Sequence, residues 1–108
     1  MTAAMRTEED LLGSLELPAD CYWGIHTERA LHNFPLSGSP VNPALIEALA
    51  LVKKACCLAN AELGYLPGEK AEAIVAACDE IAAGKLADSF PVDALQGGAG
   101  TSTNMNIN

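Results

Sequence analysis

The middle of the chain repeats apolar residues with the period of an α-helix. Six of them recur at spacings of three and four and would form one stripe on a helix. Asn42 can cap such a helix, Pro43 suits its first position, and Gly64 suits its end. The pattern predicts a helix over residues 43–64 with the stripe in the core. The stripe consists of Leu45, Leu49, Val52, Cys56, Ala59 and Leu63.

A second amphipathic stretch follows Pro67. Ile74, Cys78 and Ile81 share one face of this stretch, and Gly84 suits its end. The spacing predicts a helix over residues 68–83.

The first third of the chain is less regular. Residues 1–18 hold short extended pieces around Gly13, which favour a small hairpin or an irregular arm. Residues 19–34 have a loose helical spacing of apolar positions, and Asp20 can cap a short helical segment there. Residues 35–43 are rich in Pro, Gly and Ser and predict a loop. The fold is therefore expected to be mainly α, with two to three helices and a short N-terminal β-hairpin or extended arm.

Composition narrows the class of protein. A chain of 108 residues, half of them hydrophobic, suits a single domain. A net charge of −8 with only six scattered Lys and Arg argues against a nucleic-acid partner. No apolar run reaches about 18 residues, so no membrane span is expected. Acidic residues stand where a signal peptide needs an apolar stretch.

The four cysteines form neither a CxxC metal pattern nor a disulfide framework. Small buried thiols in a reducing cytosol explain them better. A cytoplasmic protein without a metal site is therefore expected.

The end of the chain, residues 96–108, is rich in small and polar side chains. Its glycines permit positive φ and close backbone approach, and the next four residues are good helix caps. The start of a helix offers unpaired N–H groups that suit a small anion such as a carboxylate or phosphate. An ordinary turn with a helix cap is the alternative interpretation. The residues are Gly97, Gly98, Gly100, Thr101, Ser102, Thr103 and Asn104.

Neither common nucleotide loop fits this run. The phosphate-binding GxxxxGK[ST] motif needs a lysine that is absent here, and Thr103 stands where GxGxxG needs its third glycine. A nucleotide is thus disfavoured, and no cofactor is expected.

The same run carries a family resemblance. A glycine-rich turn leading through Thr-Ser-x-Asn-Met-Asn into a long helix is the first signature region of the fumarase/aspartase superfamily, and the chain resembles it with PVDALQGGAGTSTNMNIN. The stretch RTEEDLLGSLELPADCYWGIHTERALHNF is similar to the N-terminal arm of these enzymes. LVKKACCLAN and AIVAACDEI resemble their first two helices. The resemblance runs from about Arg6 to Asn108.

Within the superfamily, three features resemble the aspartate ammonia-lyase branch. The turn reads Gly-Gly-Ala-Gly-Thr-Ser, His26 stands where fumarases tend to carry Gln, and FPVD precedes the loop. A fumarate hydratase is the alternative within the superfamily. A stand-alone helical binding or structural domain is the alternative of a different class.

The resemblance implies an activity, anti elimination of ammonia from L-aspartate to give fumarate without an organic cofactor. Thr101 matches the family threonine whose hydroxyl and backbone N–H contact a substrate carboxylate, and Gly100 would permit close approach. Ser102 and Asn104 match positions near the pocket, with capping or packing as the alternative. His26, His32 and Arg29 are expected to be structural, Arg29 through a salt bridge to the acidic arm.

The resemblance also implies a larger protein. The family builds its active site from three regions of different subunits in a homotetramer, and only the first matches this chain. The serine base and the site histidine belong to later regions, so no catalytic residue is expected here. The chain is accordingly expected to be an N-terminal fragment that is inactive alone and self-associates through its apolar helix faces.

Overall fold

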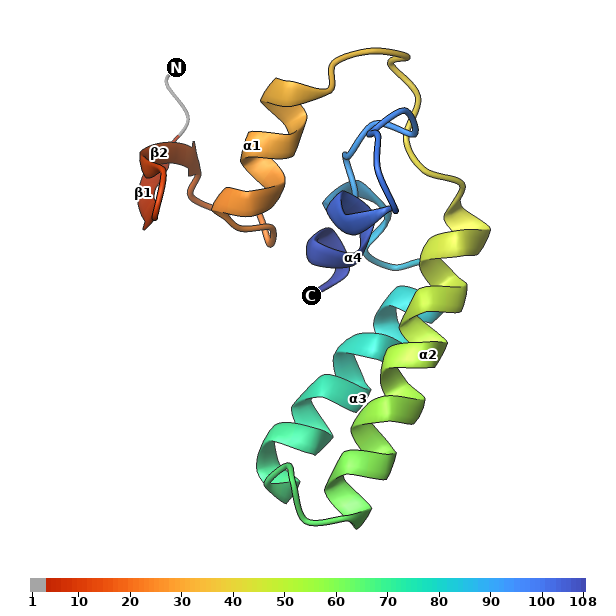
Figure 1. Cartoon of the computed structure of the whole chain (residues 1–108). Helices are drawn as coiled ribbons and strands as arrows, with labels where there is room; N and C mark the ends of the chain where they lie inside the picture. Colours follow the sequence, from red (N-terminus) through yellow and green to blue (C-terminus); the bar gives the residue numbers. More distant parts are fainter. Residues whose placement is uncertain (1–3) are drawn as a thin grey trace. The chain divides into compact units, whose positions relative to one another are not determined.

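The structure is a computed structural model that describes residues 4–108 (Figure 1). This part of the chain forms two compact units, one of residues 42–87 and one of the remaining described residues up to Val41 together with residues 88–108. Helices predominate, and a two-stranded sheet stands near the N-terminus. The predicted class, mainly α with a short N-terminal β-hairpin, is confirmed.

The unit of residues 42–87 is a helical hairpin. Helix α2 (Pro43–Glu62) and helix α3 (Gly68–Ala82) pack side by side (Figure 1). Asn42 caps α2, since its Oδ1 accepts the N–H of Ala44 at 2.9 Å.

Both helices of this unit end in the same glycine-based motif. Gly64 at the end of α2 has a φ of +81°, and Gly84 at the end of α3 has +77°. After α2, the N–H of Tyr65 donates to the carbonyl of Asn60 at 2.9 Å and that of Gly64 to Ala61 at 3.1 Å. These are the two bonds of a Schellman motif, which needs a left-handed residue and therefore favours glycine.

Small side chains bring α2 and α3 together. The buried residues at their interface are Ile46, Ala50, Cys57, Ala71 and Cys78. The α2 members fall at spacings of four and seven, as one face of a helix requires. Burial raises the pKa of the Cys78 thiol, with the nearby Cys57 as a smaller cause.

The stripe predicted on α2 is not the face that packs on α3, since its members are exposed within this unit except for the half-buried Leu49. Leu45, Val52 and Leu63 are 49%, 57% and 68% exposed. Helix α2 is apolar on nearly every side, so its periodicity does not select the packing face. The neighbouring face packs instead, because alanine and cysteine allow the helix axes to approach. Cys56 is exposed as well, against the expectation of a buried thiol.

The N-terminal hairpin belongs to the other unit. Strand β1 (Met5–Asp10) pairs antiparallel with strand β2 (Gly13–Pro18), with Met5 opposite Pro18 and Asp10 opposite Gly13. Asp10 Oδ1 accepts the N–H of Leu12 at 2.9 Å inside the turn. Leu17 is fully buried and anchors the hairpin.

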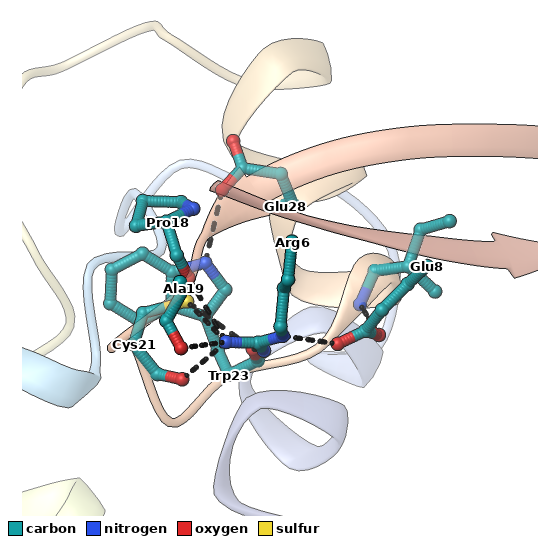
Figure 2. A network of polar contacts seen from close by, with 8 residues as sticks. Arg6, Glu8, Pro18, Ala19, Cys21, Trp23 and Glu28 are labelled. Carbon is teal, nitrogen blue, oxygen red and sulfur yellow. Dashed lines mark hydrogen bonds and ion pairs between the residues drawn. The ribbon is translucent and has the colours of Figure 1, made fainter. Parts of the chain in front are cut away.

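Helix α1 (Ile25–Asn33) begins later than the predicted segment 19–34. The reason is Arg6, whose guanidinium binds the chain between β2 and α1 (Figure 2). Its nitrogens donate to the backbone carbonyls of Pro18, Ala19, Cys21 and Trp23 at 2.6 to 3.1 Å. These bonds hold the segment in a non-helical path, although the Pro18 carbonyl also accepts the N–H of Cys21 at 3.3 Å.

Glu8, not Asp20, serves the start of α1. Its Oε1 accepts the N–H of Ile25 at 2.9 Å, while its Oε2 binds Arg6 Nε at 2.9 Å. Gly24, at the N-cap position, has no side chain to do so. The Arg6 bond and this backbone bond hold the pKa of Glu8 below its ordinary value.

A short 3₁₀ turn η1 (Ala87–Ser89) begins at the last residue of the α2–α3 unit, and helix α4 (Thr101–Ile107) closes the N-terminal unit. Between them, Asp93 forms an isolated antiparallel bridge with Pro40. Helices α1 and α4 are in contact within this unit. No helix in residues 4–108 is long and apolar enough to cross a membrane.

The packing of α2 on α3 predicts a difference between two equivalent substitutions. Ala50 is fully buried, so Ala50→Leu should overpack the helix pair and lower the free energy of unfolding by about 1–3 kcal/mol. Ala48 is exposed on the same helix, and Ala48→Leu should stay within about 0.5 kcal/mol. Urea unfolding followed by circular dichroism measures both, and equal effects would contradict this packing.

Candidate functional site

The glycine-rich turn before α4 is left-handed at three positions. Gly97, Gly98 and Gly100 have φ values of +64°, +66° and +82°. A Cβ at Gly98 would meet nothing within 4 Å, so the need for glycine there is conformational rather than steric. The turn leads directly into Thr101, the first residue of α4.

Gln96 joins the two ends of this turn. Its Oε1 accepts both the backbone N–H and the hydroxyl of Thr103, each at 2.8 Å. Its Nε2 donates to the backbone carbonyl of Asp93 at 2.9 Å. Gln96 and Thr103 are both buried, and they lie on the two sides of the glycines.

Asp93 anchors the strand-like segment before the turn. Its carboxylate accepts the N–H groups of Ser37, Gly38 and Leu95 at 2.7 to 2.9 Å. The Ser37 hydroxyl adds a bond of 2.7 Å. These bonds, the Ser37 hydroxyl first and the Leu95 N–H next, lower the pKa of Asp93 from 3.8 to about 2.

An open hollow of roughly 280 Å³ lies where α1, the hairpin turn and the start of α4 meet in this unit. Thr101 and Ser102 line it from α4. Neither of their hydroxyls has a hydrogen-bond partner within residues 4–108, so both remain able to donate to a ligand. The other lining residues are Asp10, Leu12, His26, Arg29, Ala30, Asn33 and Phe34.

The cation at this hollow is already paired. Arg29 Nε and Nη2 bind the two carboxylate oxygens of Asp10 at 2.9 and 2.8 Å, and Nη2 also donates to the carbonyl of Gly13 at 3.0 Å. This pair raises the pKa of Arg29 and lowers that of Asp10. The predicted salt bridge between Arg29 and the acidic arm is confirmed.

The four predicted site residues are placed differently. Thr101 is exposed and Ser102 half-buried on the hollow, and Gly100 is the residue that turns the chain into α4. Asn104 is exposed and is not among the residues that line the hollow. Of the four, Thr101 and Ser102 line the hollow, whereas Gly100 and Asn104 do not.

Other residues at the site were not expected there. His26, expected to have a structural or surface role, and Arg29, expected to form a salt bridge, both line the hollow as well as Thr101. Their spacing of three on α1 places them on one helix face, which was the available sequence signal. Within residues 4–108 there is no group of three or more His, Cys, Asp or Glu side chains that could hold a metal ion.

Chemically, the hollow offers neutral hydroxyl donors, an imidazole and a guanidinium whose charge is balanced by Asp10. Hydroxyl and guanidinium groups are donors suited to a carboxylate.

Known proteins share this sequence and fold. A family model described as Lyase matches residues 13–108. The chain is 52% identical to a class II fumarate hydratase of Halobacterium salinarum over 108 residues, and 55% identical to an aspartate ammonia-lyase of Pseudomonas aeruginosa over 108 residues. These alignments cover 100% and 98% of the chain but only 23% of each relative.

A solved structure agrees. The native form of a fumarate lyase:delta crystallin from Brucella melitensis superposes with a TM-score of 0.93 at 54% identity, covering 96% of this chain and 25% of that one. The fold and the matched turn thus define part of a lyase. The chain belongs to the fumarase/aspartase superfamily and corresponds to the N-terminal region of its members, about a quarter of their length.

The lowered pKa of Asp93 predicts that the folded state loses stability in acid. Because its folded-state pKa is about 2, below the ordinary 3.8, its contribution is present above about pH 4 and is lost as pH falls through about 2. Glu8 and Asp10, whose pKa values are also lowered, act in the same direction. Asp93→Asn should lower the melting temperature at neutral pH and flatten its decline in acid.

The control is Asp20→Asn, because Asp20 is exposed in the same unit. It should leave both the melting temperature and its acid dependence unchanged. Thermal denaturation across the acid range measures the three proteins. A decline in acid as steep in Asp93→Asn as in the unmutated chain would contradict the assignment.

Proposed function

We propose that the chain is the N-terminal region of an aspartate ammonia-lyase and that Thr101 binds one carboxylate of L-aspartate or fumarate. One observation carries the proposal: the unpartnered Thr101 hydroxyl lines a hollow together with Ser102 and the guanidinium of Arg29. A neutral donor can follow the growth of charge on a carboxylate during elimination, while cations elsewhere hold the remaining charge.

The proposed reaction is an anti elimination. A base removes the Cβ proton of L-aspartate, the adjacent carboxylate becomes an aci-carboxylate dianion, and ammonia leaves from Cα to give fumarate. In this reaction the chain binds that carboxylate through the hydroxyl and the backbone N–H of Thr101. Gly100 gives the backbone room to approach, and Ser102 is placed to add a second hydroxyl.

The proposal also implies that the catalytic base comes from outside this chain. The base of the superfamily belongs to a later region of the sequence, so this chain contributes no catalytic base and is expected to be inactive alone. Losing a general base costs about 10²–10⁴-fold in rate. We also expect a cytoplasmic homotetramer for the whole protein and self-association for the isolated chain, through the exposed apolar residues of α2.

His26 favours the ammonia-lyase over the alternatives. It occupies the position where fumarases tend to carry Gln, and it lines the hollow beside Thr101. A fumarate hydratase is the second candidate, because the Halobacterium salinarum relative with that name is 52% identical to this chain. A stand-alone helical binding domain is less favoured, because it would not require a hollow lined by free hydroxyls.

The choice between the two activities is tested on the full-length protein. Fumarate formation is measured by ultraviolet absorbance with L-aspartate and, separately, with L-malate. We expect turnover with L-aspartate and none with L-malate. Turnover with L-malate alone would replace the ammonia-lyase by a fumarate hydratase, and turnover with neither would exclude both.

Thr101 has its own test in the full-length enzyme. Thr101→Ala should lower kcat/KM for the substrate on the order of 10²-fold, the usual effect of losing one donor to a developing negative charge. Thr101→Ser keeps a hydroxyl and should retain most of the activity. Thr7→Ala is the control, because Thr7 is exposed on β1. Unchanged kcat/KM in Thr101→Ala would remove Thr101 from the site.

A further inference from the structure

The buried carboxamide of Gln96 has one possible orientation. Its Oε1 must face Thr103, because the backbone N–H of Thr103 can only donate. Its Nε2 must then face the carbonyl of Asp93, which can only accept. Gln96 is 8% exposed and Thr103 5%, so water does not compete for these bonds.

Gln96 replaces the side-chain cap that α4 lacks at its N-cap position. Gly100 holds the N-cap position of α4 and has no side chain that could accept a bond from the first turn. The Thr103 N–H, at the third helical position, is the group that a Ser or Asp cap would normally satisfy. Gln96 satisfies it from the far side of the turn, across three glycines in left-handed conformations.

The far end of Gln96 is held firmly. Asp93, whose carbonyl receives Nε2, is fixed through four bonds to its carboxylate and through its bridge to Pro40. A continuous chain of hydrogen bonds thus runs from Ser37 and Gly38 through Asp93 and Gln96 to Thr103. Thr101 lies between the two residues that Gln96 connects.

We propose that Gln96 is a positioning residue that sets the place of Thr101 at the hollow and thereby the affinity for a carboxylate. Without it, the left-handed glycines would let the first turn of α4 shift. This inference rests on the proposed function, in which Thr101 binds the substrate carboxylate.

A double-mutant cycle in the full-length enzyme tests the proposal. Gln96→Met keeps the length of the side chain and removes all three of its hydrogen bonds, and it should lower kcat/KM about tenfold. In the Thr101→Ala background the same change should have a much smaller effect, because the hydroxyl is gone and only the backbone N–H at position 101 remains to be positioned. Gln96→Glu has the same shape as Gln but replaces the donor to Asp93 by a carboxylate oxygen and adds a negative charge; it serves in the cycle if Gln96→Met does not fold.

Asn42→Ala is the matched control, because it also removes a side-chain cap, here from α2. It should lower the melting temperature while leaving kcat/KM unchanged in both backgrounds.

Each outcome has one meaning. A much smaller Gln96 effect in the Thr101→Ala background supports the positioning role. If Thr101→Ala lowers kcat/KM but the Gln96 effect is absent, or multiplies fully with it, Gln96 has no special link to Thr101 and the inference fails alone. If Thr101→Ala has no effect, the proposed function fails and the inference fails with it.

Discussion

The hydrogen-bond chain from Asp93 through Gln96 to Thr103 is the constraint on which the candidate site depends. Glycine loses more conformational entropy on folding than other residues do, and this turn contains three left-handed glycines. Hydrogen bonds around the turn have to offset that loss of entropy. Asp93 binds four donors and Gln96 makes three bonds, all close to the turn in space. The glycines allow the shape of the turn, and these two polar side chains select it.

The N-terminal part of the same unit uses a similar device. Arg6 binds four backbone carbonyls of the segment between β2 and α1, and Glu8 caps α1 from a strand. Trp23 Nε1 in turn donates to Glu28 in the first turn of α1 at 3.0 Å (Figure 2). Through these contacts and the Arg29–Asp10 pair, the hairpin holds the helix that forms one wall of the hollow.

The sequence predicts local features better than long-range ones. The cap at Asn42 and the glycine ends of both long helices follow from residue preferences, and the structure shows them. The packing face of α2 does not follow, because α2 carries apolar residues on most of its faces and only the contact with α3 selects one of them. The start of α1 cannot be predicted from local residue preferences either, because it depends on Arg6, which lies 19 residues before Ile25.

The role of Gln96 cannot be predicted from the pattern of residues, because it depends on partners that only the fold brings close. Its partners are Thr103, on the other side of the turn, and Asp93, which is itself fixed by Ser37 at a separation of 56 residues. The glycines that mark the turn are visible in the sequence, whereas the polar atoms that fix it depend on the fold. The resemblance to the superfamily indicated the turn as a candidate site without showing how the turn is held.

A crystal structure of the full-length protein with bound fumarate tests the account most directly. The account predicts one fumarate carboxylate oxygen within about 3 Å of Thr101 Oγ1, with Gln96 Oε1 still bound to the Thr103 N–H. Fumarate bound with both carboxylates away from Thr101, or a turn in which Gln96 has released Thr103, would contradict it.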